Sequence, residues 1–159
     1  TEAAPRTSVV HTIAGLKDRA GGVARSVPGL CEALATEGCR TVLVSQQPGD
    51  VAPGSLLLPN AKLVETRLLP GHDWERFRFS YTPNLDRRLR LIFGEVQPTV
   101  VHDHGVWLHM NHATASATRR LGIKRVVSPR GMLEGWSLSY RGWKKRLAWG
   151  AYQQADLLS

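Results

Sequence analysis

The most constraining feature of this sequence is the alternation of short apolar, β-branched segments with amphipathic segments of helical spacing. Unbroken apolar centres rich in β-branched residues are typical of buried parallel strands. Apolar residues three and four positions apart are typical of one helix face. We predict strands at 8–14, 41–45, 62–68, 99–103, 124–128 and from 156 onward, and helices at 23–34, 84–93, 109–121 and 140–155.

This alternation predicts an α/β fold, a parallel sheet with helices on both faces. The chain has 159 residues, of which 42% are hydrophobic and 21% charged. That length suits one domain of roughly 100–200 residues, and that composition allows a buried core and excludes a disordered chain. We therefore predict a single domain over 1–159. Ligands of such folds bind beyond the carboxyl ends of the strands, so the residues after each strand are the candidates.

Three smaller features refine this prediction. Pro28 lies in the first predicted helix, where a proline is tolerable only in the first turn, so we expect some irregularity there. Gly38 is predicted to end that helix. Cys31 and Cys39 lack the CxxC spacing of a zinc site and are predicted to be free thiols. No segment approaches the roughly 18 apolar residues of a membrane span, and 1–7 lacks the apolar region of a signal peptide.

The chain is basic, with 21 Lys and Arg against 13 Asp and Glu, a net charge of +8. Such a charge fits nucleic acid, an anionic membrane surface or phosphate-bearing ligands. The basic residues cluster at 87–90, 119–125 and 141–146, and solvated helix faces would explain these clusters equally well. No recognisable nucleic-acid-binding module is present, so we predict no nucleic-acid partner.

Gly21 and Gly22 follow the first predicted strand and open the first helix. Glycines let backbone N–H groups approach an anion, and a helix N-terminus favours negative charge. The pattern is neither GxGxxG nor GxxxxGK[ST], so a plain turn is the alternative.

The fourth predicted strand ends in His102-Asp103-His104. Strand alternation places both histidines on one side and Asp103 on the other. His104 would then face the crevice, where it can contact a substrate hydroxyl or phosphate; a purely structural histidine is the alternative. His109 and His112 raise the question of zinc, but no carboxylate or cysteine cluster completes a ligand set, so we predict no metal.

Arg130 follows the fifth predicted strand and projects at the carboxyl edge, where it can bind a phosphate or carboxylate. An ion pair with Glu134 is the alternative. The last predicted helix mixes aromatic and basic residues, which suits an anionic lipid surface. In the alternative, Trp143 and Leu147 pack on the sheet and the cations are solvated.

Taken together, three motifs resemble the N-terminal domain of family 4 glycosyltransferases: 21–28, 102–107 and 128–133. Segment 143–156 continues the likeness, and 46–81 matches least. The resemblance implies a GT-B architecture, in which two Rossmann-like domains face a cleft, with this chain as one half. It also implies retaining, metal-independent transfer of a sugar from a nucleotide-sugar, with no cofactor beyond that donor substrate, to a glycan or lipid-linked acceptor.

The resemblance also assigns roles to residues. Gly21 and Gly22 would approach the donor diphosphate, and His104 would contact the transferring sugar as the catalytic residue. The remaining candidates are Arg130, Trp107 and Arg25 at the acceptor side of the cleft rim, and Lys144, Lys145 and Arg146 facing a membrane.

Relatives of this kind build bacterial exopolysaccharide, capsule or O-antigen, so we expect a cytoplasmic protein with peripheral contact to the inner membrane face. The family's nucleotide-binding basic residues and its Glu-x7-Glu motif belong to a C-terminal domain, which we expect as a partner. This chain alone is then expected to have little or no activity. Two other hypotheses stay open: a non-catalytic domain that docks on anionic membrane or lipid-linked glycan, and a metal hydrolase that uses the histidines near His104.

Overall fold

The computed structural model describes residues 7–17, 22–48, 54–74, 79–140 and 142–158. Its sheet has the order β4-β3-β2-β1-β5-β6. The strands are β1 (Ser8–Ile13), β2 (Arg40–Pro48), β3 (Glu65–Trp74), β4 (Phe79–Tyr81), β5 (Val100–His104) and β6 (Arg125–Ser128). Five of them are parallel, and β4 pairs antiparallel with β3. The predicted Rossmann-like α/β class is confirmed, since the parallel strands cross over on either side of β1.

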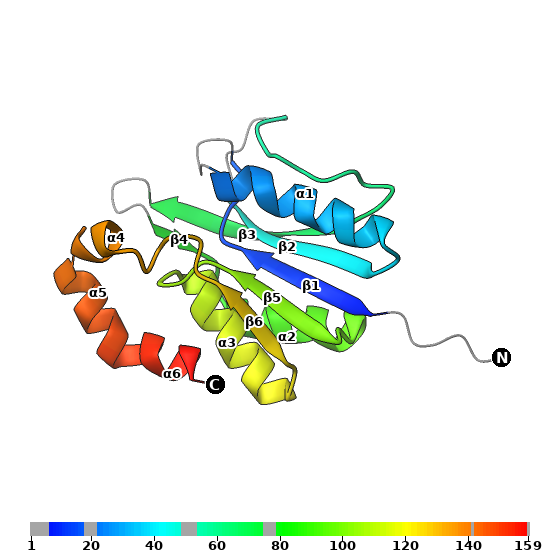
Figure 1. The fold of residues 1–159 in the computed structure, drawn as a ribbon. Helices are drawn as coiled ribbons and strands as arrows, with labels where there is room; N and C mark the ends of the chain where they lie inside the picture. The colour runs from blue at the N-terminus through cyan, green and yellow to red at the C-terminus, as the bar shows by residue number, and fades with distance from the viewer. Residues whose placement is uncertain (1–6, 18–21, 49–53, 75–78, 141, 159) are drawn as a thin grey trace.

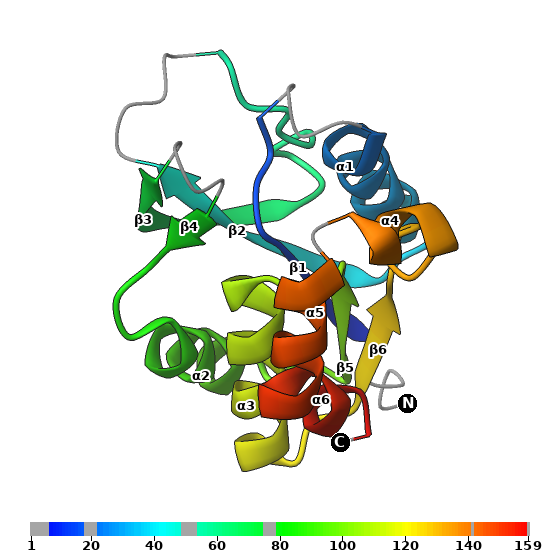
Figure 2. The ribbon, with the colours of Figure 1, turned by 90° about the vertical axis from the view of Figure 1, so that its left-hand side faces the viewer.

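Helices cover both faces of the sheet, as predicted (Figure 1). The helical segments are α1 (Gly22–Thr36), α2 (Leu85–Val96), α3 (His109–Leu121), α4 (Gly135–Ser139), α5 (Gly142–Ala148), a π-helix (Trp149–Gln153) and α6 (Gln154–Leu157). α1 lies on one side of the sheet and α2 and α3 on the other, while α6 packs on α3 (Figures 1 and 2). Among the described residues, no helix is long and apolar enough to cross a membrane.

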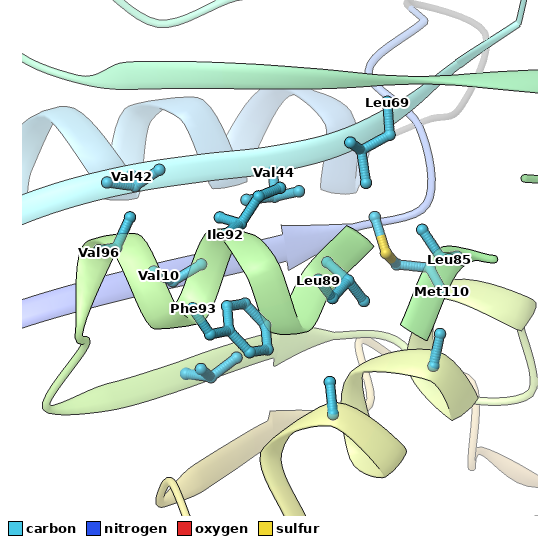
Figure 3. Close-up of a cluster of buried hydrophobic side chains, with 13 residues drawn as sticks. Val10, Val42, Val44, Leu69, Leu85, Leu89, Ile92, Phe93, Val96 and Met110 are labelled. Carbon is cyan, nitrogen blue, oxygen red and sulfur yellow. The ribbon is translucent and has the colours of Figure 1, made fainter. Parts of the chain in front are cut away.

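Side-chain alternation along the strands divides the core between these two layers. Valines of β1, β2 and β5 meet α2 and α3, where Leu89 and Phe93 are almost fully buried (Figure 3). On the other face, Ile13 and Leu43 pack against Val27 and Cys31 of α1. Both layers press on the central strand β1, whose six residues are all buried. The carboxyl end of β1 therefore rests on a rigid base.

Two expectations about the first helix have opposite outcomes. Gly38 ends it as predicted: with φ at 89°, it lets the N–H of Cys39 bond the carbonyl of Leu34 and its own N–H bond that of Ala35. The limit set on the place of Pro28 is wrong, because Pro28 is the seventh residue of α1, beyond its first turn, and the helix continues through it. It cannot donate to the carbonyl of Ala24, and its side chain is buried on the helix face.

The C-terminal prediction needs the largest correction. The predicted strand from residue 156 onward is wrong, since Gln154–Leu157 forms α6. Asp156 is almost fully buried and contacts His112 and Arg119 of α3, which holds the segment helical. The single predicted helix at 140–155 is instead α5, the π-helix and the start of α6. Strand 62–68 is displaced to β3, and the unassigned segment from 74 to 81 contains the end of β3 and all of β4.

Candidate functional site

A cluster of three histidines lies on the α1 face of the sheet, at neighbouring positions of β1 and β5. His11 is the register partner of His102, and Ile13 is that of His104. The rings of His11 and His104 stack, with centroids 5.3 Å apart and an angle of 6° between them. The centroids of His102 and His104 are 4.1 Å apart. The predicted shared orientation of His102 and His104 is thus realised, and His11 joins them.

Arg130 closes this cluster from the loop after β6. Its Nε and Nη2 donate to Nδ1 of His104 over 3.3 and 3.0 Å. A guanidinium only donates, so Nδ1 of His104 must be the unprotonated acceptor. In the described structure, the alternative pairing with Glu134 is therefore not the one that forms. The loop itself is strained, since Arg130 has φ at 53°.

The contact with Arg130 fixes the protons along the histidine chain. If Nδ1 of His104 accepts, its proton is on Nε2, which lies 3.0 Å from Nδ1 of His11 and donates to it. The proton of His11 is then on Nε2, a buried atom with no hydrogen-bond partner among the described residues. His102 completes its own bond through Nε2, 2.7 Å from Oγ of Ser128. The cluster therefore has a defined tautomer order that ends in one unsatisfied donor.

All three histidines are neutral at neutral pH. Burial lowers the pKa of His11 to about 4, with further lowering by His102 and Arg130. Burial also lowers the pKa of His104 to about 2, helped by the other two histidines and Arg130. The pKa of His102 is lowered by burial and by Arg130. These groups can therefore exchange hydrogen bonds with a ligand, and they do not act as cations.

Neutral imidazoles are also metal ligands, and one nitrogen from each histidine lies within 4.8 Å of the others. The guanidinium of Arg130, however, places a permanent positive charge against His104 and occupies its Nδ1. His109 and His112 do not join this group: His109 stacks on Tyr81, and His112 lies 2.8 Å from a carboxylate oxygen of Asp156. The absence of a metal stays a prediction.

Trp107, in the loop after β5, is held in a strained conformation, with φ at 73°. Its backbone N–H donates to Oε1 of Gln153 over 2.7 Å, and its carbonyl accepts from the hydroxyl of Tyr152 over 3.0 Å. Its indole N–H donates to the carbonyl of Met132 over 3.2 Å. Tyr152 and Gln153 are consecutive residues of the π-helix, a distortion often found at functional sites. The sequence offered no signal for this π-helix.

Asp103 lies on the opposite face of β5 and is fully buried. Its carboxylate accepts from Thr12 and Asn111, each over 2.8 Å, and from Arg125 over 3.3 Å. Burial raises the pKa of Asp103 to about 7, although all three donors favour the charged form. Asn111 also donates to the carbonyl of His104 over 3.3 Å. This network ties β1, α3 and β6 to the residue before His104.

The structure brings together three of the residues singled out from the sequence: His104, Arg130 and Trp107. Gly22 starts α1 and is exposed, with open space for a Cβ, and Arg25 is exposed within the first turns of that helix. Gly21 and the side chain of Lys144 lie outside the described residues. The sequence did not single out His11, because a histidine inside an apolar strand gives the same pattern as a core residue.

The aromatic and basic residues near the C-terminus surround an open pocket of about 540 Å³. Its lining residues are Trp107, Leu133, Leu138, Gly142, Lys145, Arg146 and Trp149. Lys145 donates to the carbonyl of Ser137 and lies over the Trp107 ring, 6.0 Å from its centroid. The alternative in which Trp143 and Leu147 pack on the sheet is wrong, since they are 66% and 67% exposed.

Comparison with models of known protein families matches residues 20–158 to Glycosyltransferase Family 4. No curated protein matches the chain. The match covers β5, β6 and all the helices, and so includes His104 at the end of β5 and the loops that carry Trp107 and Arg130.

Proposed function

The chain belongs to glycosyltransferase family 4, and from that premise we propose that it is the acceptor-side, N-terminal domain of a retaining, hexosyl-transferring enzyme. The enzyme moves a sugar from a nucleotide-sugar to a glycan or lipid-linked acceptor. The observation that carries the proposal is the convergence of His104 and Arg130 beyond the carboxyl ends of β5 and β6. Ligands of open α/β sheets bind at this edge.

The geometry of His104 suggests how a ligand would use it. Both ring nitrogens are engaged, one with Arg130 and one with His11. A bound phosphate or carboxylate would compete for the guanidinium, because Arg forms strong charge-assisted bonds with such anions. Nδ1 of His104 would then be free to accept a hydrogen bond from a sugar hydroxyl, which a neutral imidazole can do.

The start of α1 is the proposed approach for the donor diphosphate. α1 has 15 residues, and the N-terminus of such a helix carries partial positive charge. A Cβ built on Gly22 meets no atom of the described residues within 4 Å, so those residues do not require glycine there. A ligand that passes close to the backbone gives a reason for it. Gly21 is part of the same proposal.

The remaining parts of the proposal come from the family and from charge. We place the enzyme in bacterial polysaccharide synthesis, in the cytoplasm at the inner face of the membrane, with a C-terminal glycosyltransferase domain as partner. The donor nucleotide-sugar is a substrate, and no further cofactor and no nucleic acid take part. The net charge of +8 suits phosphate-bearing ligands.

Sugar transfer from a panel of nucleotide-sugars, assayed with the full-length protein, tests this function. Gly22→Trp blocks the proposed diphosphate approach, and Gly29→Trp is the matched control, because a Cβ at Gly29 of α1 also meets nothing within 4 Å. We expect transfer to be lost in Gly22→Trp and kept in Gly29→Trp. Full activity of Gly22→Trp would contradict the proposed role of Gly21 and Gly22 at the start of α1. Absence of transfer with every donor would contradict the proposed function.

A non-catalytic domain that docks on anionic membrane is the second candidate. It is favoured by Trp136, Trp143 and Leu147, which are 75%, 66% and 67% exposed. Trp143 and Leu147 flank Lys145 and Arg146 in the sequence of α5. Aromatic and basic side chains together bind anionic interfaces. Flotation with liposomes at low salt separates the candidates: binding that needs anionic lipid, without any sugar transfer, would favour this second one.

A further inference from the structure

We propose that the pocket between the Trp107 loop and α4–α5 binds the hydrocarbon chain of an anionic amphiphile, with its phosphate at Lys145 and Arg146. This inference rests on the proposed function, since the amphiphile would be the lipid-linked acceptor. It assigns the acceptor a place in the fold and a chemical class.

The walls of the pocket are suited to a hydrocarbon chain. Trp107, Leu133, Leu138 and Trp149 supply large apolar surfaces, and the volume of about 540 Å³ is in the range of small-molecule sites. Leu138 and Trp149 are 41% and 42% exposed, so apolar area that a ligand can cover remains open to water. Burying such area is the main gain when an apolar ligand binds.

The charges at the pocket favour an anionic head group. Its two charged lining residues are Lys145 and Arg146, and no acidic residue is among the described residues that line it. Lys145 is held in place by Ser137, to which its Nζ donates. Two cations beside apolar walls match a phosphate attached to a hydrocarbon chain.

The pocket adjoins the loops of the candidate site. Trp107 is both a wall of the pocket and part of the loop that follows His104. Leu133 follows Arg130 by three residues, and the indole of Trp107 bonds the carbonyl of Met132 between them. An acceptor whose chain fills the pocket would therefore present its head group next to the loops that follow His104 and carry Arg130.

Binding of decyl phosphate below its micelle concentration, measured by calorimetry on the full-length protein without donor, tests the proposal. Gly142→Phe fills the pocket, and we expect it to fold because a Cβ there meets no described atom within 4 Å. Gly94→Phe in α2 is the control, with the same open space outside the pocket. We expect Gly142→Phe to weaken binding at least about tenfold, and Gly94→Phe to leave it unchanged.

A second pair of variants tests the head group. Arg146→Gln should weaken binding of decyl phosphate by about threefold to tenfold. Arg120→Gln, which removes an exposed charge from α3, should not change it. A neutral decyl ethylene glycol ether should bind more weakly than decyl phosphate, and inorganic phosphate alone should not bind.

Three results would overturn the proposal: equal affinity of the Gly142→Phe and Gly94→Phe proteins, equal affinity for the neutral and anionic amphiphiles, or equal affinity for inorganic phosphate. A protein that transfers sugar but fails these binding tests keeps the proposed function and loses the pocket. A protein that binds decyl phosphate at the pocket but transfers no sugar keeps the pocket and loses the enzyme.

Discussion

The two faces of β5 carry polar groups of opposite character. On one face, Asp103 accepts hydrogen bonds from Thr12, Asn111 and Arg125 and is fully buried. On the other, one residue along, His104 joins a neutral chain of imidazoles that ends at His11 Nε2, which has no partner among the described residues. Both hydrogen-bond networks include residues of the same short strand. They differ because, among the described residues, the histidine network ends in a donor without a partner.

The hydrogen-bond network on the Asp103 face stabilises the fold. Its donors come from β1, α3 and β6, so it joins three elements around β5. On the histidine face, the donor His11 Nε2 has no partner among the described residues. The neighbouring residues Trp107 and Arg130 have a strained backbone. Such strain persists only where surrounding structure maintains it, and it concentrates at functional sites. We therefore propose that the Asp103 face serves folding and that the histidine face contacts the ligand.

The largest predicted effect on stability follows from removing the Asp103 carboxylate. Asp103→Ala leaves Arg125, whose side chain is 5% exposed, without its carboxylate partner. Removing one member of a buried pair costs about 3–5 kcal/mol, so the free energy of unfolding should fall by that amount. Urea denaturation followed by circular dichroism measures it. Asp103→Asn is the milder control, and a loss below about 1 kcal/mol in Asp103→Ala would contradict the structural role.

The second predicted effect is a loss of folding stability in acid, caused by the histidine cluster. The histidines titrate near 6.5 in the unfolded chain, but His11 titrates at about 4 when folded. Below pH 6.5 the unfolded chain therefore binds a proton that the folded protein does not, and stability falls as pH falls toward 4. Asp103 opposes this, since its raised pKa makes the folded state hold a proton up to about pH 7.

Comparison with His11→Phe isolates the histidine contribution from that of Asp103. The variant lacks the imidazole of His11. Between pH 6.5 and about 4, its free energy of unfolding should therefore fall by about 1.4 kcal/mol per pH unit less than that of the wild type. Urea denaturation across this pH range gives both slopes. Parallel slopes for the variant and the wild type would show that His11 does not titrate as described.

The hydrogen bonds that hold the Trp107 backbone should contribute less to stability. Gln153→Ala leaves the partly buried backbone N–H of Trp107 without its acceptor, and an unsatisfied donor costs about 1–3 kcal/mol. Tyr152→Phe removes only the bond to the Trp107 carbonyl and should cost about 1 kcal/mol. Thermal unfolding ranks the two variants. A larger effect of Tyr152→Phe would mean that the π-helix holds the loop mainly through its tyrosine.

The smallest predicted effect on stability comes from Arg130→Ala. Arg130 is partly exposed, so the free energy of unfolding should change by less than about 1 kcal/mol. The pKa of His104, lowered mainly by burial and also by Arg130, should rise. Titration of the histidine rings by NMR measures this shift. An unchanged pKa would place the guanidinium away from His104 in solution.

The fold was predictable to a large extent because its signals are local. Strand alternation placed His102 and His104 together and Asp103 opposite, which the hydrogen bonds of β5 confirm. Joining His11 to them requires the register between β1 and β5, about 90 residues apart, which local pattern does not contain. At the C-terminus, a short apolar run around Leu157 fits strand or helix alike, and the contacts of Asp156 with α3 decide for helix.

Nucleotide release from a nucleotide-sugar, measured per folded molecule of the full-length enzyme, tests the division between the two faces most directly. The two variants to compare are His104→Asn and Asp103→Asn, which change adjacent residues on opposite faces of β5. We predict that His104→Asn lowers the rate at least about 100-fold, while Asp103→Asn lowers stability and keeps the wild-type rate. A wild-type rate in His104→Asn would contradict the account, since the histidine face would then be structural as well.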